Sequence, residues 1–187
     1  MRRRDDHGLS MVDLLVAVAI VGAITPALAG ALLIGWRTTE STVDHLADTG
    51  NRQRLQAFFV RDMQSAKTVD TDGSSATCTS AGDTLVVRMR WSDTVGGATV
   101  NRVAAYVRSG SADDLQLVRR SCDDSSGTMT STGSVTVAHR MTAAPSLLCF
   151  DSTGALTSPG CSPVADAELT VTDASGTFTG TGRRRSM

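Results

Sequence analysis

The apolar residues of this chain are concentrated near its N-terminus. From Leu9 to Trp36 the sequence carries a single charged side chain, Asp13, and three arginines stand just before this run at positions 2–4. At a rise of about 1.5 Å per residue, a helix over this run measures about 42 Å, whereas the hydrocarbon core of a bilayer is about 30 Å thick. The run predicts a membrane-spanning or export segment, and the arginines place its N-terminal end in the cytoplasm.

Helical periodicity continues beyond Trp36, but on one face only. Apolar residues recur there with helical spacing, and polar residues lie opposite them. The apolar positions are Val43, Leu46, Ala47, Leu55, Phe58, Phe59, Met63 and Ala66. The pattern predicts one helix from about Ser10 to Ala66, apolar all round over 9–36 and amphipathic over 37–67. Pro26 removes one backbone hydrogen bond, so we expect it to kink or locally melt the span.

The remaining residues, 68–187, have the pattern of a β-rich globular head. Asp, Ser, Thr and Gly crowd residues 68–82, which predicts a loop. Short apolar runs separated by turn residues follow, and they predict strands at 84–91, 100–107, 115–120, 134–141, 147–150 and 168–172. We expect a flexible C-terminal tail from about residue 174. The expected fold class is α+β, with a long helix packed on an antiparallel sheet.

Charge and motifs exclude several classes of function. The 18 Lys and Arg residues balance 19 Asp and Glu residues, which leaves no large net field to hold nucleic acid, so we expect no nucleic-acid partner. The sequence contains no GxSxG, HExxH or phosphate-loop motif, and none of its three histidines has a candidate nucleophile beside it. We therefore expect neither an enzyme nor a cofactor, and no small-molecule substrate.

The four cysteines all lie in the head, where an exported domain can form disulfides. Three pairings are possible, and we favour Cys149 with Cys161, which closes a short loop, and Cys78 with Cys122 across the strands between them. A zinc site is not expected, because no two cysteines have CxxC spacing. Residues 70–73 have the acidic opening of a calcium loop but lack its closing Glu, so we expect a structural turn there.

The apolar run at the N-terminus admits more than one kind of export segment. A secretory signal peptide would be cut after Ala29, although the apolar run continues beyond that point. A plain uncleaved anchor fits the length of the run, but it gives no role to Asp13. A carboxylate inside a membrane span costs about 2.5 kcal/mol or more, so it needs a partner.

The stretch 2–22 resembles the N-terminus of type IV prepilins and pseudopilins. In that family a short charged leader ends in Gly, an apolar residue follows, and an acidic residue, nearly always Glu, stands fifth after the cut. The resemblance makes residues 1–8 a leader cut after Gly8, and Leu9 the N-methylated new N-terminus. It makes Asp13 the acidic residue that pairs with the N-terminal amine of a neighbouring subunit. Asp in place of Glu is a departure, because the side chain is one methylene shorter.

Looser features of the head resemble minor pseudopilins of the J type. They are the helix end at 55–66, the strand residues 105–107 and 117–119, and the stretch 148–154. The resemblance implies a pilin-like fold and a single-pass subunit in the inner membrane, with its head outside the cytoplasm. It also implies processing by a prepilin peptidase and assembly with other pilins or pseudopilins into a type IV pilus or secretion pseudopilus.

Two questions stay open at this point. The sequence does not distinguish between pilus and secretion systems, or between a tip subunit and a shaft subunit. The alternative function is a secreted or surface-anchored β domain that binds an envelope ligand, exported by the cut after Ala29.

Overall fold

The structure is a computed structural model that describes residues 11–74, 77–111, 114–157 and 160–185, with the side chains at 27 and 37–48 also left out of the description. It divides into two compact units, Met1–His45 and Leu46–Met187. The second unit contains the whole β-sheet and the last turns of the helix.

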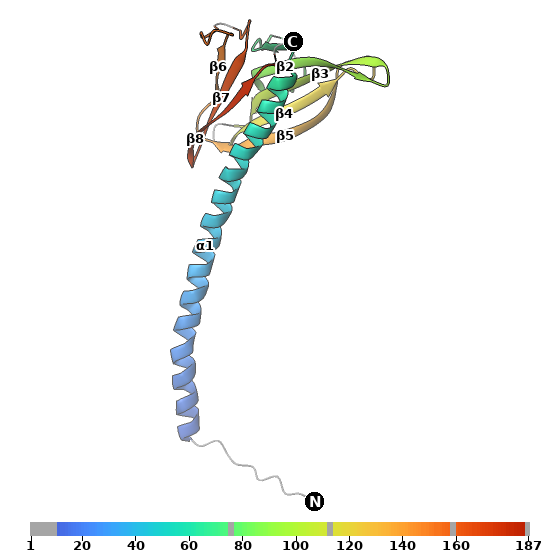
Figure 1. The fold of residues 1–187 in the computed structure, drawn as a ribbon. Helices are drawn as coiled ribbons and strands as arrows, with labels where there is room; N and C mark the ends of the chain where they lie inside the picture. The colour runs from blue at the N-terminus through green and yellow to red at the C-terminus, as the bar shows by residue number, and fades with distance from the viewer. Residues whose placement is uncertain (1–10, 75–76, 112–113, 158–159, 186–187) are drawn as a thin grey trace, which may run out of the picture. The chain divides into compact units, whose positions relative to one another are not determined.

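The one helix, α1 (Met11–Ser65), is continuous (Figure 1), which confirms the predicted helix to within a residue at each end. It does not unwind at Pro26, so the expectation of local melting there is wrong. Within α1, Met11–Trp36 is long and apolar enough to cross a membrane, with a mean hydropathy of 2.3, and none of its most apolar window is buried in protein. This stretch fits a single-pass membrane anchor.

The C-terminal turns of α1 carry the predicted apolar stripe into the core. Leu55, Phe59 and Met63 are almost completely buried, as is Ala66 just after the helix, and Phe58 is half-buried. The opposite face is exposed, as expected, at Arg52, Gln56, Arg61 and Gln64. The remaining stripe positions, Val43, Leu46 and Ala47, lie outside the described side chains.

The six predicted strands are all present, and several are longer than expected. The observed strands are β1 (Thr68–Asp70), β2 (Thr84–Val95), β3 (Ala98–Ser109), β4 (Leu115–Asp123), β5 (Thr130–Met141), β6 (Ser146–Phe150), β7 (Asp166–Asp173) and β8 (Gly176–Arg183). They form an antiparallel sheet with strand order β1-β2-β3-β4-β5-β7-β6, in which β8 pairs with β7. A helix packed on an antiparallel sheet is the α+β class expected from the sequence.

The expected tail from about residue 174 is instead a strand, which corrects the sequence prediction. β8 pairs with β7 along its whole length and turns Phe178, Gly180 and Gly182 inward. A Cβ atom at Gly182 would lie 2.6 Å from Cβ of Met63, and one at Gly180 would lie 3.0 Å from Cγ of Leu55. Glycine is needed here because α1 approaches the strand too closely for a side chain, whereas in the sequence glycine indicated a loop.

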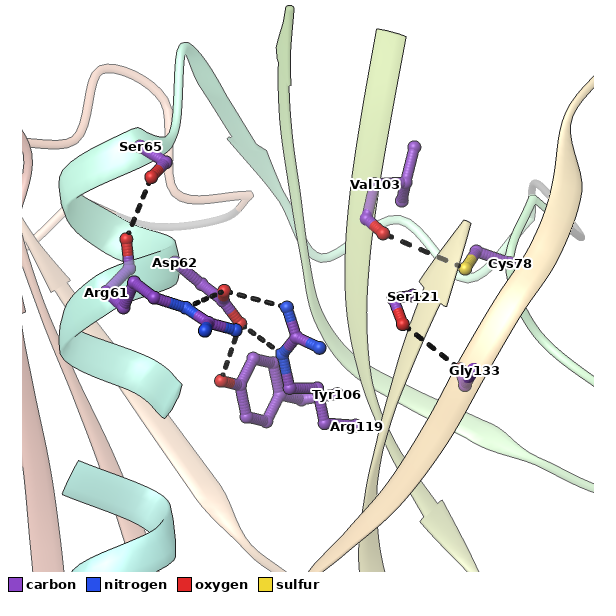
Figure 2. Close-up of polar contacts among 9 residues, drawn as sticks. All are labelled: Arg61, Asp62, Ser65, Cys78, Val103, Tyr106, Arg119, Ser121 and Gly133. Atoms are coloured by element: carbon purple, nitrogen blue, oxygen red, sulfur yellow. Dashed lines mark hydrogen bonds and ion pairs between the residues drawn. The ribbon is translucent and has the colours of Figure 1, made fainter. Parts of the chain in front are cut away.

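The predicted loop at 68–82 also needs a correction, since its first residues form β1 against β2. The chain beyond β1 covers the face of β2–β4 that points away from α1. There, Cys78 forms a disulfide with Cys122, and its Sγ lies 4.0 Å from the carbonyl oxygen of Val103 (Figure 2). Asp83 accepts a 2.7 Å hydrogen bond from Nε of Arg120. Both faces of the central strands are therefore covered.

The sheet is nearly divided between β5 and β7, which share the single register pair Met141 and Asp173. Asn51 of α1 bridges this joint from a buried position. Its Nδ2 donates to the carbonyl of His139 and to Oδ2 of Asp173, and its Oδ1 accepts from the backbone N–H of His139, each at 3.3 Å. One helix side chain thus ties the two parts of the sheet together.

Candidate functional site

The processing residues expected from the sequence, Gly8 and Leu9, lie outside the described residues. Asp13 is described, and its side chain is exposed in the first turn of α1. It borders a shallow groove along one face of the helix, together with Leu14, Ala17, Val18, Val21 and Gly22. The helix thus presents a carboxylate at the start of an apolar surface. Placed in hydrocarbon, such a group costs about 2.5–3.5 kcal/mol, so a cationic partner there is strongly favoured.

The cysteines pair as favoured from the sequence, Cys78 with Cys122 and Cys149 with Cys161, with Cα–Cα distances of 5.9 and 5.3 Å. The first bridge fastens the covering segment to β4. The second closes the turn between β6 and β7. Disulfides restrict the unfolded chain, and bridges over loops of these lengths contribute about 3 to 4 kcal/mol each in the chain-entropy model.

The acidic turn at 70–73 uses its carboxylates within the protein. Asp72 accepts hydrogen bonds from the backbone N–H and the hydroxyl of Ser74, at 2.9 and 2.7 Å, and these lower its pKa below the ordinary value. Asp70 lies 3.4 Å from Nη1 of Arg88 and 3.6 Å from Nη2 of Arg90. Across the described parts of the chain, no group of three or more His, Cys, Asp or Glu side chains is placed to hold a metal ion.

A buried ion pair joins α1 to the sheet, and the sequence analysis did not identify it. Asp62 of α1 accepts two hydrogen bonds from Arg119 of β4, 2.5 Å from Nε and 2.8 Å from Nη2 (Figure 2). The hydroxyl of Tyr106, on β3, donates to the same carboxylate at 2.9 Å. The two hydrogen bonds make the ion pair bidentate. All three residues are buried, so the interface between α1 and the sheet shields the pair from water.

Aromatic rings enclose this buried cluster. The ring of Phe58 lies 5.4 Å from Cζ of Arg119 and also 5.4 Å from Cζ of Arg61, which suits cation–π attraction. Phe59 meets Tyr106 edge to face, with centroids 5.6 Å apart. Rings packed on the guanidinium keep water away from it, which strengthens its interaction with Asp62.

The burial of the cluster changes the pKa values of Arg119 and Tyr106. Burial disfavours the charged form of Arg119, but the hydrogen bonds and charge of Asp62 outweigh burial and raise the pKa of Arg119. Burial, and then the negative charge of Asp62, raise the pKa of Tyr106 well above its ordinary value. The phenol therefore stays protonated and donates. The arrangement positions α1 on the sheet.

The sequence contains a signal for this cluster, because Asp62 interrupts the apolar stripe between Phe59 and Met63. Arg119 likewise follows the inward-facing Leu117 at a spacing of two in β4. A charge at an inward position of a helix and another at an inward position of a strand indicate a buried pair, since an isolated buried charge is too costly.

Neither a model of a known protein family nor a curated protein sequence matches this chain. Its residues and their geometry therefore carry the functional conclusions.

Proposed function

We propose that this chain is a prepilin-like minor structural subunit of a type IV pilus or secretion pseudopilus. In this proposal it enters the inner membrane with its N-terminus in the cytoplasm, a prepilin peptidase cuts it after Gly8, and Leu9 becomes an N-methylated N-terminus. The observation that carries the proposal is the single carboxylate of Asp13, fifth from that cut, on the apolar stretch of a helix whose later turns cover an antiparallel sheet.

The physical argument depends on where Asp13 finds a cation. Cleavage before Leu9 exposes an amino group inside or beside the same apolar layer. Pairing a carboxylate with an amine there offsets much of the cost of about 2.5–3.5 kcal/mol that the carboxylate carries in hydrocarbon. When the amine belongs to a neighbouring subunit, this gain is available only at a contact between subunits. The pair therefore favours assembly over dispersal in the membrane.

The head supports an assembly role through its stability. Two disulfides, a buried ion pair and central strands covered on both faces stabilise the head. A subunit that works by occupying a place in a filament needs such a domain and no turnover site.

The test is the mature N-terminus of the full chain, extracted from a membrane that contains a prepilin peptidase and measured by intact mass and N-terminal peptide analysis. We expect a start at Leu9 with one added methyl group. Gly8→Ala should block the cut, whereas Gly22→Ala, where an added Cβ meets no atom within 4 Å, should be processed normally. A start at Gly30 would replace the proposal with the signal-peptide alternative, and an uncut chain would contradict both.

Assembly is tested separately by the charge at Asp13. Asp13→Asn should be cut normally but be recovered in the filament fraction at a level reduced about tenfold, because a neutral amide gains little from the amine. Asp13→Glu restores the charge and should assemble. Equal incorporation of the Asn variant would show that the carboxylate has no part in assembly.

A further inference from the structure

Basic side chains gather just beyond the C-terminal end of α1. Lys67, the second residue after the helix, donates its backbone N–H to the carbonyl of Arg90 at 2.8 Å. It lines a recess of about 370 Å³ together with Arg90 and Trp91 of β2 and Arg102 of β3. Trp91 is half-buried, so its indole forms an apolar part of this surface.

Lys67 also lines a second recess, of about 240 Å³, with Ala66, Arg184 and Arg185. Arg184 is held there by its backbone, which donates to the carbonyl of Ala165 at 2.8 Å, and by its Nη1, which donates to the carbonyl of Lys67 at 3.3 Å. Among the residues that the structure describes, no carboxylate lines this second recess. We name the cations that line the two recesses the basic band: Lys67, Arg90, Arg102, Arg184 and Arg185.

The protein neutralises only part of the basic band. Arg90 lies 3.6 Å from Asp70, and Arg102 lies 2.7 Å from Asp93. Among the described residues, the side chains of Lys67, Arg184 and Arg185 form no ion pair. The chain as a whole has a formal net charge of -1, so the band is a local concentration of positive charge and not a reflection of composition.

The one carboxylate that lines either recess is already occupied. Asp124 accepts hydrogen bonds from the side-chain and backbone N–H groups of Asn101, both at 2.7 Å, and these lower its pKa. Because its pKa is lowered, Asp124 stays charged, but its oxygens are engaged with Asn101 of β3.

The helix itself accounts for only part of this charge. The C-terminal end of a helix carries a partial charge of about −0.5, which one nearby cation balances. No basic residue lies in the last turn of α1, so cations beyond the helix supply that balance. The three cations that form no ion pair with another described residue exceed what the helix end requires. The surplus favours an anion from outside the chain.

We propose that the basic band binds an acidic segment of a partner protein that carries at least two carboxylates and an apolar side chain. Guanidinium groups bind carboxylates through paired hydrogen bonds, as Arg119 binds Asp62 within this head. Trp91 and Met129 give the larger recess an apolar part that suits a peptide side chain. Nucleic acid is disfavoured because its binding depends mainly on cations that neutralise phosphates, and two of the five cations of the basic band are already paired.

The experiment follows binding of a short synthetic peptide of alternating glutamate and leucine to the full chain in detergent. The intrinsic fluorescence of Trp91 reports binding, with Trp36→Phe as the background so that no other tryptophan contributes. We expect saturable binding that weakens as salt is raised, and no binding of the same peptide with glutamine in place of glutamate. The double substitution Lys67→Gln with Arg185→Gln should weaken binding about tenfold or more, equivalent to about 1.4 kcal/mol.

Arg54→Gln is the matched control, because Arg54 is exposed on α1 and lines neither recess. It should leave binding unchanged. Thermal unfolding of each variant shows whether the head remains folded. Equal binding of the glutamine peptide, or equal binding by the Lys67 and Arg185 variant, would overturn the proposal. The proposal would also be overturned if the chain did not bind the acidic peptide but bound duplex DNA or anionic lipid vesicles through Lys67 and Arg185. The proposal stands whether or not the chain is cut after Gly8.

Discussion

Removal of the Asp62 carboxylate tests whether the buried ion pair holds α1 on the sheet. Asp62→Ala leaves the guanidinium of Arg119, which is 7% exposed, without its partner, and leaves the hydroxyl of Tyr106 without an acceptor. Breaking a buried pair in this way costs about 3–5 kcal/mol. For a domain of this size, about 2–4 °C of midpoint are lost per kcal/mol, so the unfolding midpoint should fall by about 6–20 °C.

The assay is unfolding of the full chain in detergent, followed by the fluorescence of Trp91 in a Trp36→Phe background. The matched control is Asp93→Ala, which breaks an equally short ion pair with Arg102 at the surface, where the two side chains are 47% and 38% exposed. Exposed pairs contribute about 0–1 kcal/mol, so this variant should shift the midpoint by at most a few degrees.

A third variant separates the value of the pair from the cost of breaking it. Replacing Asp62 by Leu, Arg119 by Met and Tyr106 by Phe together removes every polar group of the cluster, and apolar replacement of a buried pair is often neutral or stabilising. We expect this variant to recover most of the stability that Asp62→Ala loses. If Asp62→Ala costs no more than Asp93→Ala, the cluster does not stabilise the head and the reasoning from burial is refuted.

Two further outcomes follow from the packing and charges of the head. Gly182→Ala should cost about 1–3 kcal/mol of unfolding free energy, because its Cβ would meet Cβ of Met63 at 2.6 Å. Gly73→Ala should not have this cost, because the added atom meets nothing within 4 Å. Equal midpoints for the two variants in thermal unfolding would contradict the close approach. Burial raises the pKa of Asp83, but hydrogen bonds from Arg120 and from the backbone of Ser80 outweigh burial and hold the pKa below 3.8. The ionised carboxylate therefore stabilises the head above about pH 4, and this stabilisation is lost as the pH falls through the lowered pKa. Chemical unfolding at pH 6 and pH 3 should therefore show a smaller loss of stability on acidification for Asp83→Asn than for the unaltered chain, and parallel losses would contradict it.

The sequence predicted the helix well because each half of α1 has its own simple pattern. Residues 11–36 are apolar on every side, and the stripe through Leu55, Phe59 and Met63 has helical spacing. The central strands could also be predicted from the sequence, because they are short apolar runs, rich in β-branched residues, that turn residues separate. Of the three possible disulfide pairings, the structure has the one that was favoured because Cys149 and Cys161 are the closest neighbours in sequence.

The misassigned segments have a common physical cause. Glycine and threonine in 176–183 indicate a tail when read locally, but Gly180 and Gly182 are small because a helix from the other end of the chain lies against them. β1 is only three residues long and exists because β2 offers it an edge. Both strands depend on contacts between residues far apart in sequence, which local propensity does not report.

The buried polar residues were missed for a different reason. The sequence analysis assigned no role to Asn51 or Asp62, although both lie at inward positions of α1. Their partners are on strands about 57 to 122 residues away in sequence, at Arg119 and Asp173. An inward polar residue is recognisable in the sequence, but its partner is identified only when the strands are placed in register.

The contacts of Asn51 and Asp62 also explain how the C-terminal turns of α1 are positioned on the sheet. Backbone hydrogen bonding within α1 is the same whether lipid or protein surrounds it, so only the side chains change along its length. Through Trp36, α1 has a largely apolar surface with one charged side chain, Asp13. From Asn51 onward, an apolar stripe alone would allow α1 to turn or slide on the sheet. Two polar side chains fix both the rotation of α1 and its position along its axis: Asn51 at the joint of β5 with β7, and Asp62 on Arg119. Each forms its hydrogen bonds only when the helix lies in one register on the sheet.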